Sequence, residues 1–405
     1  MTIHDAAGPG TTDKPLGRAR GTDFFRIADQ LTEQEREIWQ RTRHFVDDEV
    51  LPVINDHWER ADFPRDLVRR LGELGLVGDG IEGYGCPPLG PLANGLIHLE
   101  LNRGDGSVGT FLGVQSGLAM QSIAMLGSEE QKQRWLPSMA TVDALGAFAL
   151  TEPNHGSDSV ALETSARRDG DHWALDGEKK WIGNGTVADV VVVWARDTED
   201  GQVKGFLVEP SMEGYDATRI DGKGSLRSVW QAHIRLDGVR VPESSRLPGA
   251  RSFKDTGRVL AGTRNAVAWA ALGHATAAYE IAVDYCSRRH QFGRPLVSFQ
   301  IVQERLVKML AEVSSMQLYC LRLGRLMEEG QLTDTIAALA KMNNTSKARQ
   351  VIAEARDLLG GNGILLENHV MRHMADMEAL HTYEGTETIQ TLIVGRDITG
   401  VGAFT

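Results

Sequence analysis

The amino-acid sequence predicts a mainly α-helical protein with a β domain in the middle of the chain. Apolar residues recur at helical spacing up to about residue 145 and again after residue 255. The segment between them contains short apolar runs and alternating patterns that are typical of strands. Strands grouped between two sets of helices indicate separate domains, and they disfavour an alternating βαβ dinucleotide-binding fold.

The domain limits follow from these patterns and from a length of 405 residues, which suits two or three packed domains. We expect a flexible N-terminal tail at residues 1–24, a helical domain at 25–145, a β domain at 146–250 and a helical domain at 251–405. The tail is rich in Gly, Thr and charged residues, and it has no apolar core of the kind that secretory signals carry.

The first helix is expected to begin near Thr32, because Thr32 and Glu35 have the spacing of a capping box and apolar residues follow on one face. Apolar or amphipathic stretches at 67–76, 92–101 and 116–125 predict further helices. Gly- and Pro-rich segments separate them.

The middle segment is expected to be an antiparallel β domain. The dipeptides Asp176-Gly177 and Asp237-Gly238 lie between alternating apolar residues, which predicts two hairpins with these dipeptides at their turns. Residues 188–196 and 204–210 are expected to be buried strands.

The last third is expected to contain long helices at about 257–289, 297–329 and 332–358. Their many Ala and Leu residues suit packing of helix on helix, and short turns with Pro or Gly join them.

Composition excludes several classes of protein. With 41% hydrophobic and 24% charged residues the chain is typical of globular proteins. The net charge of −12 argues against nucleic acid or an anionic membrane as a partner. No apolar run is long enough to span a bilayer. The three cysteines, Cys86, Cys286 and Cys320, form neither a disulfide framework nor a zinc motif, so we expect a cytoplasmic protein.

One loop and two tryptophans in the middle of the chain each have a structural and a functional interpretation. Residues 148–158 are either a polar interdomain loop or a loop whose backbone approaches a heterocycle or phosphate. Trp181 and Trp194 are either core aromatics or, in the case of Trp181, a surface for a flat ring system.

The C-terminal third offers similar pairs of interpretations. Residues 288–293 are either a solvated helix end or a pyrophosphate-binding cluster, and residues 359–363 are either a helix C-cap or a phosphate cradle. Glu384 is either a surface charge or, if it is buried in an apolar cleft, a base with a raised pKa. His369 and His373 have an i,i+4 spacing, but no HExxH pattern or Cys partner accompanies them, so we expect no metal site. No GxSxG or P-loop motif is present.

Five segments, taken together and in order, resemble the acyl-CoA dehydrogenase family: LTEPNHGSD, KKWIGN, RRHQFGRPL, LLGGNGI and YEGTETIQTLIVGRDITG. The resemblance covers essentially everything after the N-terminal tail. The WIGN tetrapeptide and the final IVGRDITGVGAF are most similar to the glutaryl-CoA dehydrogenase group and to the plant short-chain acyl-CoA oxidases that belong to it.

This resemblance implies an N-terminal helical domain, a β-barrel-like middle domain and a C-terminal four-helix bundle, assembled as a homotetramer that binds FAD between the middle and C-terminal domains. The implied reaction is α,β-dehydrogenation of a short or branched acyl-CoA to the trans-2-enoyl thioester, in fatty acid metabolism. Electrons would pass to an electron-transfer flavoprotein.

The resemblance also implies roles for single residues. Glu384 would take the α-proton while the flavin accepts a hydride from the β-carbon, and the Glu384 N–H would bind the enolate oxygen together with a ribityl hydroxyl of FAD. Substrate contact is implied for Gly109, Gly113, Arg264, Gly385 and Arg396. Contact with FAD is implied for Leu150, Thr151, Gly156, Ser157, Trp181, Gly183, Thr386 and Thr388, and contact with the FAD of a neighbouring subunit for Arg289, Gln291, Phe292, Asp357, Gly360 and Gly361.

Two positions depart from the family pattern. Glutaryl-CoA dehydrogenases carry an Arg and a Ser for the distal carboxylate where this chain has Gly109 and Gly113, so recognition of glutarate is not expected. Gly183 stands where most members carry a Thr whose hydroxyl approaches the flavin. A missing donor and free space there would let oxygen reach reduced flavin more easily.

Several alternatives therefore stay open at this point. They are a short-chain acyl-CoA oxidase, a glutaryl-CoA dehydrogenase, a dehydrogenase of acyl groups carried on the phosphopantetheine of a carrier protein, a flavin-dependent monooxygenase of the same fold, and a catalytically silent homologue. The presence of Glu384 argues against the last two, which do not need this base.

Overall fold

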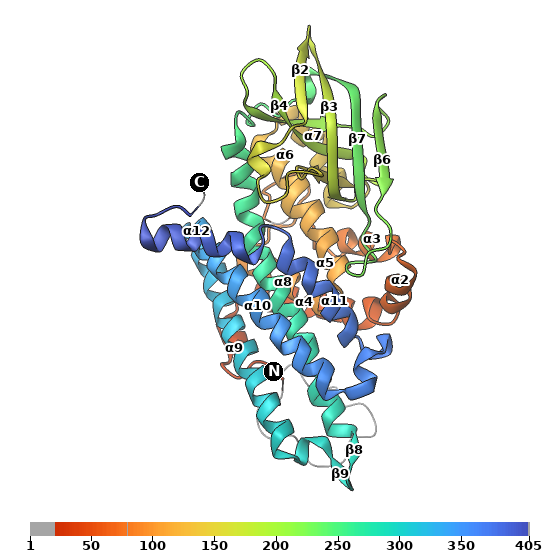
Figure 1. The fold of residues 1–405 in the computed structure, drawn as a ribbon, viewed down its shortest axis with the longest axis vertical. Coiled ribbons are helices and arrows are strands. Elements are labelled where there is room, and N and C mark those ends of the chain that lie inside the picture. Colours follow the sequence, from red (N-terminus) through yellow and green to blue (C-terminus); the bar gives the residue numbers. More distant parts are fainter. Residues whose placement is uncertain (1–20, 79, 404–405) are drawn as a thin grey trace.

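Helices, strands and helices follow one another along the chain in the predicted order (Figure 1). The computed structural model describes residues 21–78 and 80–403. Part of the expected tail, residues 1–20, therefore lies outside the described residues. The sheet forms one end of the elongated molecule, and long helices run from it to the opposite end (Figure 1).

The N-terminal part is helical, and its first helix begins where the capping box predicts: the Thr32 hydroxyl accepts from Glu35 N–H and the Glu35 carboxylate accepts from Thr32 N–H. Its central helix, α4, is buried on all sides, because nearly every residue from Leu92 to Gly104 is inaccessible to solvent. The elements are α1 (Glu33–Phe45), α2 (Ile54–Arg60), α3 (Arg65–Glu73), α4 (Pro91–Gly104), α5 (Gly106–Leu112), the π-helical segment η3 (Gly113–Met120), α6 (Gln121–Leu126) and α7 (Glu129–Ala140).

The middle part is a seven-stranded sheet with the strand order β1-β4-β2-β3-β7-β6, and β5 pairs with β4. It is mixed rather than purely antiparallel, because β4 pairs in parallel with both β1 and β2. The expected buried strands at 188–196 and 204–210 are confirmed as β4 and β5. The strands are β1 (Gly146–Ala149), β2 (Ser165–Asp169), β3 (His172–Gly183), β4 (Val190–Asp197), β5 (Val203–Val208), β6 (Tyr215–Arg219) and β7 (Gln231–Pro242).

The two predicted Asp-Gly hairpins are wrong. Both dipeptides lie inside the long strands β3 and β7, which pair with each other, and the register shifts between Leu175 and Gly177. The dipeptides meet across this pair, since Gly238 N–H donates to Asp176 Oδ1 over 2.7 Å. A Cβ at Gly177 would lie 2.6 Å from Thr164 Oγ1, so the glycine serves a bulge and a close approach rather than a turn.

The C-terminal part consists of long helices, and α8 packs against α4, α9 and α10 (Figure 1). A short hairpin of β8 (His290–Gln291) and β9 (Arg294–Pro295) lies at the end of the molecule opposite the sheet. The helices are α8 (Phe253–Arg288), α9 (Gln300–Glu328), α10 (Asp334–Leu358), α11 (Val370–Thr382) and α12 (Glu387–Thr399). Within the described part of the chain, no helix is both long enough and apolar enough to cross a membrane.

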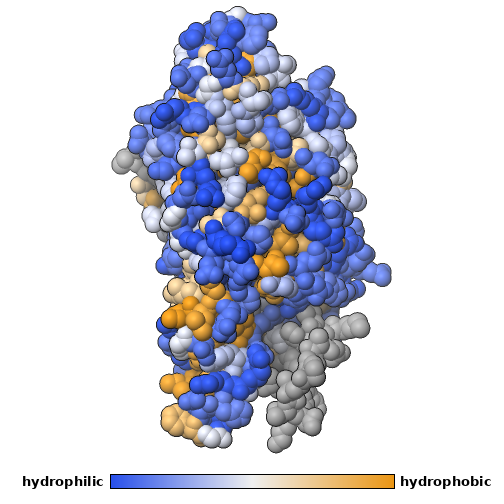
Figure 2. Space-filling model, turned by 90° about the vertical axis from the view of Figure 1, so that its right-hand side faces the viewer, coloured by the Kyte–Doolittle hydropathy of each residue, from blue (hydrophilic) through white to orange (hydrophobic). Residues whose placement is uncertain are grey.

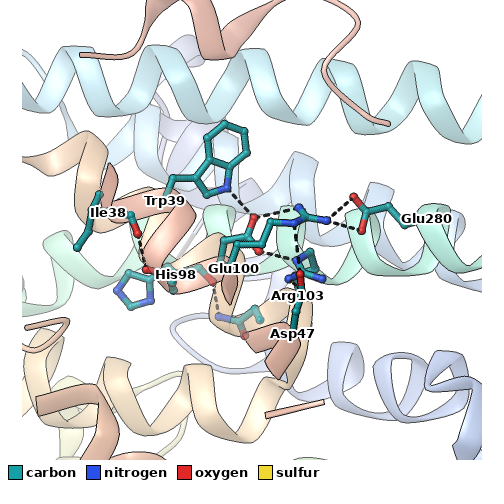
Figure 3. A network of polar contacts seen from close by, with 10 residues as sticks. Ile38, Trp39, Asp47, His98, Glu100, Arg103 and Glu280 are labelled. Atoms are coloured by element: carbon teal, nitrogen blue, oxygen red, sulfur yellow. Dashed lines mark hydrogen bonds and ion pairs between the residues drawn. The ribbon is translucent and has the colours of Figure 1, made fainter. Parts of the chain in front are cut away.

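A buried polar network ties the two helical parts together (Figure 3). Glu100 of α4 accepts from Trp39 Nε1 over 2.6 Å and from Arg103 Nε over 2.5 Å. Arg43 of α1 bridges Glu100 and Glu280 of α8, at 3.3 and 3.1 Å. Burial opposes ionisation of Glu100, but Arg103 and Arg43 outweigh it and lower the pKa of Glu100. The network is therefore an array of paired charges between residues far apart in the sequence.

Candidate active site

Glu384 lies in the tight turn that joins α11 to α12. Its backbone is left-handed, with a φ of 55°, and Gly385 follows with a φ of 83°. A Cβ at Gly385 would lie 2.4 Å from the Gln390 amide nitrogen, so only glycine fits there. The next residue, Thr386, caps α12 by accepting a hydrogen bond from Ile389 N–H. The turn thus presents the Glu384 side chain at the start of a helix.

The Glu384 carboxylate faces α8. Thr263 Oγ1 of that helix donates to Glu384 Oε2 over 2.8 Å. Burial raises the pKa of Glu384, and Thr263, Lys341 and Arg264 oppose this rise. A carboxylate with a raised pKa is suited to accept a proton from carbon.

Two buried side chains hold the carbonyl oxygens of this turn. Lys341 of α10 donates from Nζ to the carbonyls of Tyr383 and Gly385. Gln390 Nε2 donates to the carbonyls of Glu384 and Gly385, over 2.8 and 3.1 Å. The three consecutive carbonyls of residues 383–385 therefore all have partners.

The segment formed by α5 and η3 connects this turn to the sheet. Thr110 of α5 lies close to Tyr383: burial raises the pKa of Tyr383, and the nearby Thr110 partly offsets this rise. Four residues further along the chain, Val114 lies against β3, where a Cβ at Gly183 would be 2.8 Å from Val114 Cγ2. The predicted base and the predicted flavin-facing strand thus border the same helical segment. The free space expected beside Gly183 is not found there, because the Val114 side chain occupies it.

The loop of residues 150–157 is anchored to β3 at its first residues. Lys179 Nζ donates to Leu150 O over 3.1 Å and pairs with Glu152 Oε1 over 2.8 Å. Thr151 O accepts from Lys180 N–H over 2.8 Å. Gly156 and Ser157 are exposed, and a Cβ at Gly156 would meet no atom within 4 Å. The loop therefore has one fixed end and one open end.

Trp194 and Trp181 differ in how far they are buried. Trp194 is fully buried and packs against Phe148, so it is a core residue. Trp181 is 55% exposed at a backbone φ of 65°. The Trp181 ring is a large apolar surface that the sheet leaves uncovered, next to the anchored end of the loop.

The residues predicted to contact the FAD of a neighbouring subunit lie away from Trp181 and the loop beside it. Phe292 is 92% exposed in the β8–β9 hairpin, at the opposite end of the molecule from the sheet (Figure 1). Asp357 is paired with Arg305 over 2.8 Å near the end of α10. A single chain does not bring this group together with Trp181. The group comprises Arg289, Gln291, Phe292, Asp357, Gly360 and Gly361.

The predicted substrate residues fall into two groups. Gly385 and Arg264 lie at the Glu384 turn, and Arg264 Nη1 is 3.8 Å from Asp334 Oδ2. Gly109 and Gly113 lie along α5 and η3. Space at Gly109 is filled, since a Cβ there would be 2.2 Å from Asn102 Nδ2, whereas a Cβ at Gly113 would meet nothing within 4 Å. The remaining predicted substrate residue, Arg396, is exposed on α12, and so is Thr388, a predicted FAD contact.

Sequence reasoning missed three residues of this site: Thr263, Lys341 and Asn102. Thr263 directly precedes the predicted Arg264, so a search along the same helix would have found it. Lys341 and Asn102 lie in ordinary helical patterns and carry no local signal.

The pair His369 and His373 does not form a shared site. His373 Nδ1 lies 2.8 Å from His274 Nδ1, whereas His369 Nδ1 contacts Asn55 and Arg372. The two rings therefore have different partners.

Comparison with known proteins matches all three parts of the chain to family models. Residues 32–143 match the acyl-CoA dehydrogenase N-terminal domain, residues 147–239 the middle domain and residues 253–399 the C-terminal domain.

Individual proteins agree with these models. The chain is similar to a crystal structure of glutaryl-CoA dehydrogenase from Mycobacterium smegmatis, with 43% identity over 96% of this chain and 100% of that one, and a TM-score of 0.93. A second glutaryl-CoA dehydrogenase structure from the same organism, in complex with FADH2, is 39% identical over 95% of this chain and 98% of that one, with a TM-score of 0.92. The mitochondrial short-chain specific acyl-CoA dehydrogenase of Bos taurus is 34% identical over 90% of each chain.

Proposed function

Since the chain belongs to the acyl-CoA dehydrogenase family, we propose that it dehydrogenates a short or branched, uncharged acyl thioester, with Glu384 as the base. The enzyme is an FAD-dependent acyl-CoA dehydrogenase. The observation that carries the proposal is the Glu384 turn, in which the carboxylate is held by Thr263 while its backbone N–H remains available.

The residues on the sheet side fit a flavin. The uncovered indole of Trp181 offers a flat apolar surface, and the adjacent loop leaves open space at Gly156. Leu150, Thr151 and Ser157 would hold the ring system from that loop. When bound, FAD supplies the hydride acceptor for the reaction.

The chain's own groups carry the proton chemistry. Glu384 takes the α-proton, and its raised pKa makes the carboxylate a stronger base than an exposed one. A thioester α-proton is only weakly acidic, so the developing enolate oxygen needs a preorganised donor. Among the described residues no acceptor contacts the Glu384 N–H, which leaves it available for that oxygen.

Glutarate is disfavoured as the acyl group. Gly109 supplies no cation, and the Asn102 amide fills the space beside it. A distal carboxylate entering this region would lose its hydration without gaining an ionic partner. The similarity to glutaryl-CoA dehydrogenases therefore does not extend to the residue that would pair with the substrate charge.

We propose an electron-transfer flavoprotein, and not oxygen, as the main electron acceptor. Val114 fills the space beside Gly183, which removes one route by which a small molecule would approach. We also propose a cytoplasmic location, because all three cysteines are free thiols of the kind a reducing compartment maintains.

The exposed apolar residues support a homotetramer. Phe292 and Ile398 are 92% and 77% exposed. Hydrophobic side chains also gather at the end of the molecule that carries β8 and β9 (Figure 2). Apolar surface of this kind is typical of contacts with other subunits. Such contacts would place Arg289, Gln291 and Phe292 beside the cofactor of a neighbour.

The test is anaerobic bleaching of the bound flavin by a panel of acyl-CoAs with C4 to C8, branched and dicarboxylic chains, and by one acyl-phosphopantetheine. We expect a neutral short or branched chain to bleach it fastest. Glu384→Gln should retain FAD and reduce it about 10²–10⁴-fold more slowly. Wild-type rates in this variant would refute the role of Glu384, and an enzyme that no acyl thioester bleaches would refute the proposed reaction.

A further inference from the structure

Lys341 is a buried cation that the proposed reaction does not yet use. It lies on α10 with 1% of its surface exposed. Among the described residues no carboxylate lies within ion-pair distance of its amino group. The charged groups that face it are Glu384 and Arg264, and burial lowers the pKa of Lys341 to about 8. An ammonium group in such a place is costly, so packing alone does not account for it.

The hydrogen bonds of Lys341 fall on both sides of Glu384. Its Nζ donates to the carbonyl before this residue and to the carbonyl after it. The carbonyl of Tyr383 and the N–H of Glu384 belong to one trans peptide unit, in which the two groups point in opposite directions. A cation that fixes the carbonyl on one side therefore aims the N–H to the other side. In the part of the chain that the structure describes, that N–H has no acceptor.

The turn also needs support. Glu384 is a residue with a side chain in the left-handed region, which is strained for any residue but glycine. Gln390 restrains the carbonyls of Glu384 and Gly385. Lys341 is the partner of the Tyr383 carbonyl, so the peptide that carries the free N–H depends on this lysine.

We propose that Lys341 is a positioning residue: its ammonium group orients the 383–384 peptide so that the Glu384 N–H and the Glu384 carboxylate face the same thioester. The inference rests on the proposed role of Glu384. A positive charge at the carbonyl end also polarises the peptide, which makes its N–H a stronger donor to a developing enolate oxygen.

The experiment compares Lys341→Met with Lys341→Arg and with Lys347→Met. Lys347 lies on the same helix, is half-buried and pairs with Glu312 over 2.9 Å, so its replacement is a matched loss of charge away from the turn. Flavin content, melting temperature and the limiting rate of anaerobic flavin reduction by the best acyl-CoA are measured for each. The dissociation constant of that acyl-CoA is measured alongside.

A second readout isolates proton removal. A 3-thia-acyl-CoA has sulfur in place of the β-carbon, so the enzyme removes its α-proton but has no β-hydrogen to transfer. The enolate that forms against the flavin gives a long-wavelength charge-transfer absorbance. This signal reports enolate stabilisation without turnover.

We expect Lys341→Met to lower the limiting rate of flavin reduction about 10²-fold, the size of effect seen when one oxyanion donor is lost. Acyl-CoA affinity should change little and the 3-thia absorbance should largely disappear. Lys341→Arg should restore part of both signals, because it keeps the charge, and Lys347→Met should behave as wild type.

A Lys341→Met enzyme with wild-type reduction rate and wild-type 3-thia absorbance overturns the proposal, and so does an equal loss in Lys347→Met. If the Met variant does not fold with FAD, Lys341→Gln, which still donates hydrogen bonds but is neutral, is measured the same way, and a wild-type result again overturns it. Failure of the proposed function is distinguishable, because it appears as an unaffected Glu384→Gln enzyme.

Discussion

Replacing Gly183 with threonine tests how closely β3 approaches the helical segment that leads to Glu384. Gly183 has no positive φ, so threonine is not strained there, and strands favour this residue type. The new Cβ would nevertheless lie 2.8 Å from Val114 Cγ2 and 3.5 Å from Cγ1. Val114 is β-branched and helical, so it has few other rotamers to adopt. Overpacking of this kind costs about 1–3 kcal/mol.

The partner variant is Val114→Ala, which removes the two methyl groups that cause the clash. Val114→Ala alone should lower the free energy of unfolding by about 1–2 kcal/mol, because it loses buried apolar surface and leaves a small cavity. In Val114→Ala/Gly183→Thr the threonine side chain fills the released space, so the double variant should be more stable than the sum of the single effects predicts, by about 1–2 kcal/mol. The assay is urea unfolding of all four FAD-loaded proteins. Additivity within about 0.5 kcal/mol would refute the contact.

The same four proteins test the electron acceptor. Hydrogen peroxide formed per enoyl thioester in air should be small for the wild type and smaller for the double variant, in which a threonine hydroxyl is restored without the clash. Peroxide equal to product, at the turnover seen with an artificial acceptor, would show a true oxidase. If the threonine leaves the rate of peroxide formation unchanged, Gly183 does not determine how easily oxygen reaches the reduced flavin.

Three other predictions follow from the structure. Glutaryl-CoA should bleach the flavin far more slowly than a neutral acyl-CoA of similar length and release no CO₂, because Gly109 offers no cation; efficient CO₂ release in a radiometric assay would contradict this. Lys179→Met should leave Glu152 as an unpaired buried charge, lowering the free energy of unfolding by about 3–5 kcal/mol and loosening FAD, which a melting curve and the flavin-to-protein ratio check. Burial lowers the pKa of His274 from 6.5 to about 3. Between these values the unfolded chain binds a proton that the folded chain does not, so the free energy of unfolding should fall as the pH is lowered, by about 1.4 kcal/mol per unit for this group. His274→Asn should show a shallower pH dependence, and an identical slope would contradict the assignment.

Periodicity predicted the order of the elements well, because amphipathic helices such as α1 bury one face and the buried strands β4 and β5 are apolar runs. It failed at Asp176-Gly177 and Asp237-Gly238, where a turn dipeptide and a bulged strand pair have the same local sequence. Only the pairing of β3 with β7, set by residues some 60 positions apart, distinguishes them.

Some residues of the candidate site could also be predicted from local sequence, whereas others could not. Glu384, Gly385 and Trp181 lie in short segments that resemble the family, so the sequence alone predicted a role for each of them. Lys341 acts on a turn more than 40 residues further along the chain. Asn102 matters only because α4 brings it against Gly109. Such roles come from packing between helices, which no local pattern encodes.

The polar network around Glu100 has a consequence for how the protein is made. Arg43 meets Glu280 across 237 positions of the chain, so the ribosome has released more than half of the protein before this partner exists. Until then, the N-terminal helices hold an incomplete set of charges and an uncovered face of α4, which invites non-native association. Three modules can be distinguished in the sequence, yet the first is completed only by the third. Chaperone dependence should therefore be greatest for nascent chains that end before α8.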